Sequence, residues 1–354
     1  MALNPRHRLC TLLLVLCMLM PCSALAAKKT SGPTATPAPT IPEPTLSRDA
    51  ADYDPEHPEN LESNQLYASS AILVEASSGD VIFEKDAYKV MYPASMTKMM
   101  TIMLALNAVD QGIISLDDMV TVSARAMDIP DGSSTMGLKE GETLSFQDLL
   151  YGTVLCSANE GANVIAEVVS GSIEAFVDLM NETAYELGCT STHFANPHGY
   201  HDDNHYTTAY DLTLIARAAM QNDTFMQISG TYSYTLAKTN MHKMRTITNT
   251  NTLLKPDTSD NANKYYYEYA TGLKTGTTSK AGYCFAASAE KDGVELISVV
   301  MFTGNRARWA DSIKLMNYGF SQYVSVTPVD LYNMNPIVIE TSGYSLQDTQ
   351  LGKL

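Results

Sequence analysis

The segment Tyr92–Lys98 (YPASMTK) is followed directly by an apolar run at residues 99–106 (MMTIMLAL). Pro93 near the first turn and apolar residues on nearly every side predict a helix that is buried inside a domain. Ser95 and Lys98 are three residues apart, so a helix places them on one face, about one turn apart and within reach of a hydrogen bond.

This spacing suits nucleophilic catalysis. A serine hydroxyl is a weak nucleophile unless a base accepts its proton. Lys98 can be that base only if its ammonium form is disfavoured, and the apolar neighbours and a second cation, Lys274, would lower its pKa. A position in the first turn also gives Ser95 free backbone N–H groups that could stabilise an oxyanion. For this pair alone, a solvated helix start with an ordinary surface lysine is an equally good interpretation.

A second motif, Ser157-Ala158-Asn159 (SAN), lies between two predicted helices. In an extended loop the side chains of Ser157 and Asn159 face the same way, so the hydroxyl could relay a proton and the amide could hold a substrate carbonyl. The alternative is that Ser157 or Asn159 caps the helix that follows.

A third motif, Lys274-Thr275-Gly276 (KTG), opens the strands near the carboxyl end. Its alternation is typical of an edge strand in which Lys274 reaches a cleft and Gly276 leaves room for a substrate backbone. Thr277 then offers a backbone N–H as a second oxyanion donor. The alternative is a surface lysine beside a turn.

The fold is predicted from where the hydrophobic period changes. Short β-rich runs at 69–76 and 81–85 flank a turn and predict a hairpin. Apolar strand-like runs occur again late in the chain. Between the early and late strands, apolar residues that recur every three or four positions predict helices. The late strands are 283–289 and 294–302, and the helices are 146–155, 162–169, 173–187, 210–220 and 309–320. We therefore expect an α/β (α+β) domain: one sheet built from sequence-distant pieces, flanked by helices, with a mostly helical lobe and the three motifs in the cleft between them.

The chain ends differ in composition from this domain. Arg6 and Arg8, an apolar run and Ala24-Leu25-Ala26 predict a cleaved signal peptide at 1–26 rather than a retained anchor, for which the run is short. Thr- and Pro-rich residues predict a disordered linker at 27–65. The folded domain is then 66–325. Residues 326–354, with a strand-like run at 336–340, form a short segment that could begin a β-rich domain.

The net charge of −16 becomes −18 when Arg6 and Arg8 leave with the signal, which argues against binding nucleic acid or an anionic membrane. The cysteines left after cleavage are expected to be small buried hydrophobes, although a disulfide stays open; they are Cys156, Cys189 and Cys284. His198 and His205 lack the spacing of a zinc site and are expected to order loops around the cleft. No metal or cofactor is predicted.

Together and in this order, the three motifs are typical of penicillin-binding serine acyltransferases and serine β-lactamases. The sequence resembles the serine D-alanyl-D-alanine carboxypeptidases in particular, over most of residues 66–325, which implies a β-lactamase/transpeptidase-like fold with an antiparallel sheet. Beyond the motifs, the resemblance rests on YPASMTK (92–98), NPHG (196–199), HYTTAYDL (205–212), GLKTGTT (272–278) and AGY (281–283). Ala158 stands where the family usually has glycine.

The resemblance implies a role for each residue. Ser95 would be the acylated nucleophile, Lys98 the base and Ser157 the proton relay. Asn159 would hold the substrate, and the terminal carboxylate of a peptidoglycan stem peptide would bind the KTG segment. Among the binding residues are Lys274, Thr275, Gly276, Thr277 and an arginine before the last helix, for which Arg308 is favoured over Arg306.

The resemblance also implies an exported enzyme that needs no cofactor and is inhibited covalently by β-lactams. A D,D-endopeptidase, a β-lactamase on the same scaffold and a catalytically silent wall-binding protein remain as alternatives. The carboxyl end shows no cationic amphipathic helix, so attachment to a membrane is left open.

Overall fold

The structure is a computed structural model that describes residue 41 and residues 50–258 and 262–323. The chain divides into two units, Met1–Ala38 and Pro39–Leu354, and every described residue belongs to the second. The predicted signal peptide, most of the predicted linker and the segment 326–354 lie outside the described residues.

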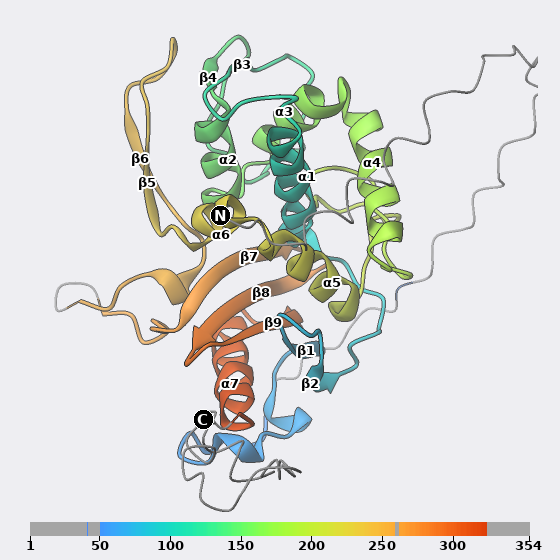
Figure 1. Cartoon of the computed structure of the whole chain (residues 1–354), viewed down its shortest axis with the longest axis vertical. Helices are drawn as coiled ribbons and strands as arrows, with labels where there is room; N and C mark the ends of the chain where they lie inside the picture. Colours follow the sequence, from blue (N-terminus) through green and yellow to red (C-terminus); the bar gives the residue numbers. More distant parts are fainter. Residues whose placement is uncertain (1–40, 42–49, 259–261, 324–354) are drawn as a thin grey trace, which may run out of the picture. The chain divides into compact units, whose positions relative to one another are not determined.

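The second unit is built on a five-stranded antiparallel sheet with the order β2-β1-β9-β8-β7 (Figure 1). Its strands are β1 (Ser70–Glu75), β2 (Val81–Lys85), β7 (Ala270–Thr278), β8 (Gly282–Lys291) and β9 (Val294–Thr303). The first and last strands of the domain are neighbours, with Ala71 opposite Val300. A single sheet made from the two ends of the domain, as predicted from the sequence, is therefore confirmed.

Both faces of the sheet are buried. Along β9, Ile297 and Val299 belong to the core beneath the helical lobe, whereas Leu296 and Val300 belong to a second core on the opposite face. Successive side chains of a strand point to opposite faces. Two covered faces therefore explain why this strand appears in the sequence as a continuous apolar run rather than as an alternation.

Helix α7 (Ala307–Ser321) covers one face, and a helical lobe covers the other (Figure 1). The lobe surrounds α1 (Lys98–Asp110), in which residues 99–106 are all buried, as predicted. The other lobe helices are α2 (Phe146–Leu155), α3 (Asn159–Ser170), α4 (Ile173–Glu186), α5 (Ala209–Met220) and α6 (Asp223–Gly230). The predicted helices are found within a few residues of their expected ends; α6 was not predicted.

Two small hairpins were also not predicted, since each strand has only three or four residues. One pairs β3 (Met119–Thr121) with β4 (Thr143–Ser145), and the other pairs β5 (Ser233–Leu236) with β6 (Arg245–Thr248).

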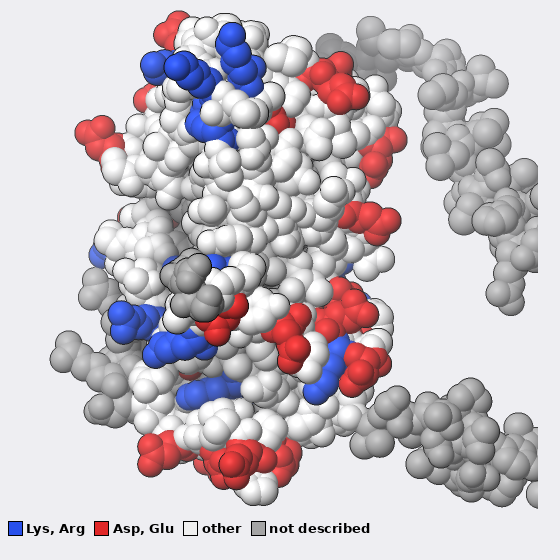
Figure 2. Space-filling model, turned by 90° about the vertical axis from the view of Figure 1, so that its left-hand side faces the viewer, with Lys and Arg blue, Asp and Glu red and all other residues white. Residues whose placement is uncertain are grey.

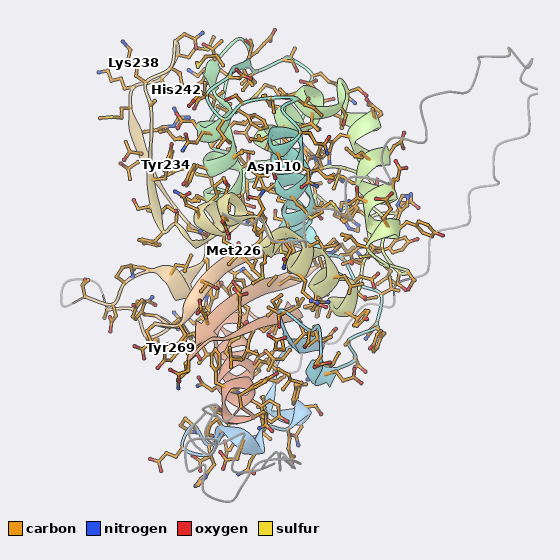
Figure 3. All side chains as sticks on the ribbon, viewed as in Figure 1. Asp110, Met226, Tyr234, Lys238, His242 and Tyr269 are labelled. Atoms are coloured by element: carbon orange, nitrogen blue, oxygen red, sulfur yellow. The ribbon has the colours of Figure 1, made fainter. Side chains whose placement is uncertain are left out.

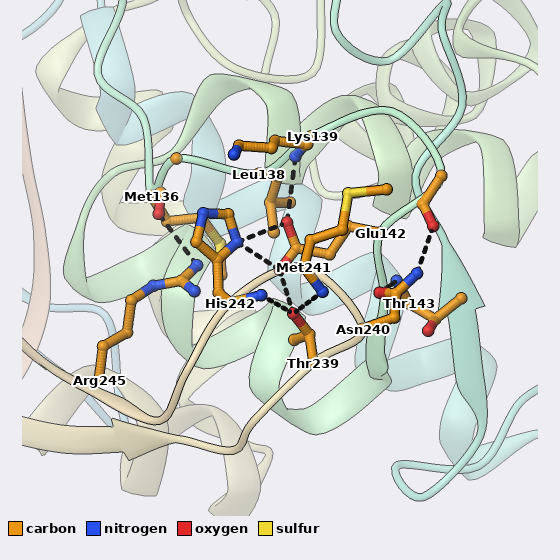
Figure 4. Close-up of polar contacts among 12 residues, drawn as sticks. Met136, Leu138, Lys139, Glu142, Thr143, Thr239, Asn240, Met241, His242 and Arg245 are labelled. Carbon is orange, nitrogen blue, oxygen red and sulfur yellow. Dashed lines mark hydrogen bonds and ion pairs between the residues drawn. The ribbon is translucent and has the colours of Figure 1, made fainter.

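The β5–β6 hairpin, which carries Tyr234, Lys238 and His242 (Figure 3), is fixed to the lobe by side-chain contacts, of which Figure 4 shows those near its tip. The Tyr234 ring stacks on Tyr151 with centroids 3.7 Å apart, and its hydroxyl donates to Asp148 at 2.8 Å. Near the tip, His242 Nδ1 lies 2.9 Å from the buried carboxylate of Glu142. Figure 2 shows Lys and Arg side chains gathered at the end of the face that carries this hairpin, although the whole chain is acidic.

The predicted boundary between linker and domain lies too late in the sequence. Residues 50–65 are ordered, with short 3-10 helices η2 (Pro58–Asn60) and η3 (Ser63–Gln65). Leu61 is buried in the core that includes α7, and Lys314 Nζ of that helix donates to Gln65 O at 2.6 Å. A few apolar side chains and backbone contacts with α7 are enough to order a segment whose composition is mostly polar.

Candidate active site

Ser95 lies in the 3-10 turn η4 (Ala94–Thr97), and the α-helix itself begins at Lys98. The prediction that Ser95 lies in the first turn of the α-helix is therefore wrong, because Ser95 lies in the 3-10 turn just before that helix. Its predicted proximity to Lys98 is unaffected. Ala94 has a φ of 49°, in the left-handed region that non-glycine residues rarely adopt. Such backbone strain persists only where surrounding contacts enforce it, and it is common at functional sites.

Lys98 Nζ lies within hydrogen-bonding distance of three oxygens. They are Ser95 Oγ at 3.1 Å, Asn159 Oδ1 at 2.7 Å and the backbone oxygen of His198 at 2.7 Å. The side chain of Lys98 is completely buried. Three segments that are distant in sequence therefore meet at one amine.

Either protonation state of Lys98 can satisfy these three distances. An ammonium ion would donate its three N–H groups to Ser95 Oγ, Asn159 Oδ1 and His198 O. A neutral amine would donate two N–H groups to Asn159 and His198, which can only accept, and only this form has a lone pair that can accept the proton of the Ser95 hydroxyl.

The surroundings of Lys98 favour this protonation state. Burial, reinforced by the positive charge of Lys274, holds the pKa of Lys98 well below its usual value, while Glu160 opposes the shift. Burial and a like charge both disfavour the ammonium form. The cation predicted from the sequence to lower this pKa is thus in place.

The SAN motif differs from the predicted extended loop. Ser157 has a φ of 59°, and Asn159 is the first residue of α3. The N-cap residue is Ala158, which makes no side-chain cap, so neither polar residue caps the helix in the way that the alternative required. Ser157 is buried, but within the described part of the chain its hydroxyl makes no hydrogen bond to Lys98.

The KTG motif lies on β7, which is an edge strand as predicted. Lys274 is buried, and its Nζ donates to Thr275 O at 3.1 Å. Burial, together with the positive charge of Arg308, lowers the pKa of Lys274 to about 7. Thr277 lines the cleft beside Ser95.

The structure indicates a different reason for a glycine at position 276 from the one predicted. A Cβ at this position would lie 2.7 Å from Pro93 O and 3.2 Å from Ala94 Cβ. The missing side chain thus lets β7 pack directly against the turn that carries Ser95, rather than leaving room for substrate.

Arg308 approaches the same end of β7. Its Nη1 donates to Thr277 Oγ1 at 3.2 Å, and burial lowers its pKa to about 10. Arg308 lies in the first turn of α7 and not before the helix, whereas Arg306 is the exposed N-cap residue. Of the two arginines, the structure brings Arg308 to the motif.

His205 ties the loop at 195–205 to the turn that carries Ser95. Ala195 N donates to His205 Nδ1 at 3.2 Å, His205 Nε2 lies 2.7 Å from Thr97 Oγ1, and that hydroxyl donates to Ala94 O. Because Thr97 uses its proton for Ala94, the Nε2 atom of His205 must be the donor. Burial lowers the pKa of His205 to about 3 and that of His198 well below its usual value.

A cleft of about 280 Å³ opens over Ser95. The other lining residues are Gly132, Ser133, Ser134, Asn159, Gly199, Tyr200, His201, Thr277, Thr278 and Ser279. The sequence did not point to Ser133, Ser134 or Tyr200, because they lie in loops without periodicity. Across the described ranges, no group of three or more His, Cys, Asp or Glu side chains is arranged to hold a metal ion, and the three cysteines there are free thiols.

Comparisons with known proteins agree with this geometry. Residues 56–305 match the family model described as D-alanyl-D-alanine carboxypeptidase. The chain is 36% identical over 257 residues to D-alanyl-D-alanine carboxypeptidase DacF of Bacillus subtilis, covering 72% of this chain and 63% of that one. It is 35% identical to D-alanyl-D-alanine carboxypeptidase DacC of Escherichia coli, with 77% and 66% covered. The chain thus spans a little under two thirds of the length of these relatives.

Solved structures give the same result for the fold. The structure is similar to the Streptomyces K15 DD-transpeptidase, with a TM-score of 0.65 and 30% identity, covering 72% of this chain and 98% of that chain. It is also similar to the D-alanyl-D-alanine carboxypeptidase DacD of Francisella tularensis, with a TM-score of 0.66 and 29% identity over 77% and 74% of the two chains. The predicted transpeptidase-like fold is confirmed.

Proposed function

The chain belongs to the D-alanyl-D-alanine carboxypeptidase family, and from this premise we propose that it removes the terminal D-alanine from peptidoglycan stem pentapeptides through an acyl-enzyme on Ser95. The observation that carries the proposal is the set of contacts at Lys98 Nζ. They bring the amine to 3.1 Å from the Ser95 hydroxyl, and the lowered pKa of Lys98 favours the neutral form that a general base needs.

The first half-reaction transfers the acyl group. Ser95 Oγ bonds to the carbonyl carbon of the penultimate D-alanine while its proton passes to Lys98. The C–N bond to the last D-alanine then breaks, and the proton is delivered to the leaving amine, with Ser157 as the relay. Backbone N–H groups of Ser95 and Thr277 would stabilise the oxyanion.

In the second half-reaction a water molecule attacks the ester. Its proton passes to Lys98, and Ser95 Oγ leaves and recovers a proton, which restores the starting state. Asn159 holds a substrate carbonyl and also accepts a hydrogen bond from Lys98, so it ties the position of the substrate to that of the base.

The carboxylate of the terminal D-alanine would bind at the KTG segment. Lys274, Thr275, Thr277 and Arg308 supply two cations and two hydroxyls around the same strand end, and Gly276 keeps that strand against the nucleophile turn. A carboxylate there would be held by charge-assisted hydrogen bonds. Because β-lactams carry a similarly placed carboxylate, they are expected to acylate Ser95.

This substrate lies outside the cytoplasm, so the proposal includes export and cleavage of residues 1–26. N-terminal sequencing of the protein recovered from the wall or medium would then begin at Ala27, and an uncleaved chain would contradict it. Within the described residues, no helix combines the length and the apolar character needed to cross a membrane.

The test is release of D-alanine from a stem pentapeptide. The proposal predicts turnover by the wild-type chain and none by Ser95→Ala, with both variants folded. Binding of the peptide without release would favour a silent wall-binding protein. Rapid repeated hydrolysis of penicillin would instead favour a β-lactamase, and cleavage confined to cross-linked dimers would favour an endopeptidase.

A further inference from the structure

Glu160, the residue after Asn159, is completely buried in the first turn of α3. Its Oε1 accepts the backbone N–H groups of Met136 at 2.9 Å, Gly137 at 3.1 Å and Leu138 at 3.4 Å, and it also accepts from the Thr135 hydroxyl. Its Oε2 is buried and has no partner among the described residues. One carboxylate oxygen therefore holds four consecutive residues.

Those residues directly follow part of the cleft wall. Ser133 and Ser134 line the cleft, and Ser134 O accepts a hydrogen bond from Asn159 N at 2.8 Å. From the other side, Arg245 Nη2 on β6 donates to Met136 O at 3.2 Å (Figure 4). The segment is thus held between α3 and the β5–β6 hairpin.

Ser133 gives this part of the cleft wall a hydroxyl that could form a hydrogen bond with a bound peptide. Its hydroxyl is buried and has no hydrogen-bond partner among the described residues, although the residue lines the cleft. Buried hydroxyls are normally satisfied. Rotation about the Cα–Cβ bond of Ser133 would turn its hydroxyl toward the cleft, where a peptide could supply the missing partner, since a hydroxyl can both donate and accept.

Glu160 also acts on the base electrostatically. The charged or titratable groups that face Lys98 are Lys274 on β7, Glu160 on α3 and the neutral His198 and His205 on the loop at 195–205. Among these, only Glu160 carries a negative charge that favours the ammonium form of Lys98.

We propose that Glu160 is a positioning residue for the reaction proposed above: its carboxylate fixes residues 135–138, so that Ser133 and Ser134 form a substrate-contacting wall. This inference rests on the proposed function. It assigns no chemical step to Glu160, which touches neither Ser95 nor the reacting bond.

Two substitutions separate the two effects. Glu160→Gln keeps the shape and one acceptor oxygen for the loop but removes the charge, whereas Glu160→Ala removes both. Glu167→Gln is the matched control, because Glu167 lies on the same helix and accepts from Ser123 Oγ at 2.6 Å, away from the cleft.

For Glu160→Ala we expect KM for the pentapeptide to rise and kcat/KM to fall about 100-fold, as a misplaced binding wall would cause. For Glu160→Gln we expect most of the plateau rate to remain and the acidic limb of the kcat/KM profile to move to lower pH. The sign follows because loss of an anion makes Lys98 harder to protonate, so the free base persists to lower pH. Glu167→Gln should match the wild type.

An unchanged KM for a folded Glu160→Ala would overturn the proposal. If Glu160→Ala does not fold, Ser133→Ala tests the wall: KM should rise several-fold with unchanged stability, and an unchanged KM contradicts it.

A further measurement separates this inference from the proposed function. Hydrogen exchange at the amides of Met136, Gly137 and Leu138 should be faster in Glu160→Ala than in the wild type, whether or not the protein releases D-alanine. Slow exchange in that variant would refute the positioning role. A wild-type chain that neither releases D-alanine nor reacts with penicillin would refute the proposed function instead.

Discussion

At the scale of single residues, the proposed chemistry requires a neutral amine at Lys98 Nζ. This nitrogen lies 2.7 Å from two acceptors and 3.1 Å from the Ser95 hydroxyl, and burial and the charge of Lys274 disfavour its ammonium form. The three-residue spacing of Ser95 and Lys98 was enough to predict their proximity. The backbone oxygen of His198 could not be predicted, because it reaches the amine only through a loop 100 residues further along the chain.

Lys98→Arg should abolish the base while keeping a long cationic side chain. A guanidinium does not lose its proton in proteins, so it cannot accept one from Ser95. We expect the rate of acylation by penicillin to fall by about 10²–10⁴, the usual contribution of a general base. The rate of acylation should fall equally in Lys98→Met, in which the new side chain fills the same apolar space. An active, folded Lys98→Arg would contradict the assignment.

Arg308→Gln should change the pH dependence of kcat/KM for the pentapeptide on its basic limb. Lys274 must be protonated to attract a carboxylate, and its pKa is lowered to about 7 by burial and by Arg308. Without Arg308, that pKa rises, so the basic limb of kcat/KM for the pentapeptide should move to higher pH.

The same substitution should raise KM, because one cation at the carboxylate site is lost. Arg306→Gln is the matched control, since Arg306 is exposed and makes no contact with β7 among the described contacts. A basic limb that moves to lower pH in Arg308→Gln would exclude this role.

At the scale of elements, the site depends on how closely β7, η4 and the loop at 195–205 pack. Gly276 brings β7 to Pro93 O, and a Cβ at Gly199, whose φ is 82°, would meet Ala94 O at 1.9 Å. Strand β7 and the loop at 195–205 thus pack against two sides of the strained turn that carries Ser95. Both glycines stand in segments that the sequence analysis singled out, but their role depends on close backbone contacts that residue patterns do not reveal.

Gly276→Ala should therefore damage both stability and acylation. Its new methyl group would lie 2.7 Å from Pro93 O, so the turn or the strand must shift. We expect the free energy of unfolding to fall by about 1–3 kcal/mol, as for other overpacked sites, and the penicillin reaction to slow.

Gly304→Ala is the matched control for Gly276→Ala, since a Cβ there makes only an ordinary contact at 3.6 Å with Ala307 Cβ. Equal effects of the two substitutions in a urea titration would argue against close packing as the reason for Gly276.

The loop at 195–205 should make the fold sensitive to acid. The pKa of His205 is lowered to about 3, against 6.5 for a free histidine. Its contribution to stability is complete above pH 6.5 and is lost as pH falls toward 3, because the unfolded chain takes up the proton first. At pH 5 the loss from this group is about 2 kcal/mol.

His205→Gln should remove that part of the pH dependence. Urea unfolding between pH 7 and pH 5 should then give a shallower fall in the free energy of unfolding than in the wild type. His57→Gln is the control, since His57 is exposed. A slope in His205→Gln equal to that of the wild type would contradict the buried, neutral imidazole.

The elements also show where sequence patterns stop being informative. Helices of ten or more residues were predicted nearly to their ends, since apolar steps of three and four persist over several turns. The 3-10 turn η4, the left-handed Ser157 and the strands β5 and β6 were not. They are too short for a period to appear, and their conformations are set by tertiary contacts.

At the scale of the whole molecule, the sheet brings the three motifs together. Strand β1 pairs with β9, and β7 lies at the edge next to the turn carrying Ser95, so segments near both ends of the domain and its middle meet at one cleft. Strand runs at both ends of the predicted domain predicted this closure. The extra order at residues 50–65 was not predicted, because it comes from packing on α7 rather than from composition.

The proposed reaction requires that Ser95 is acylated because Lys98 is its base. The most direct measurement is peptide mass spectrometry of the full chain after brief exposure to a penicillin. We predict a single adduct on the peptide that contains Ser95, present in the wild type and absent from Ser95→Ala and Lys98→Met. An adduct on a peptide lacking Ser95, or an undiminished adduct in Lys98→Met, would contradict the account.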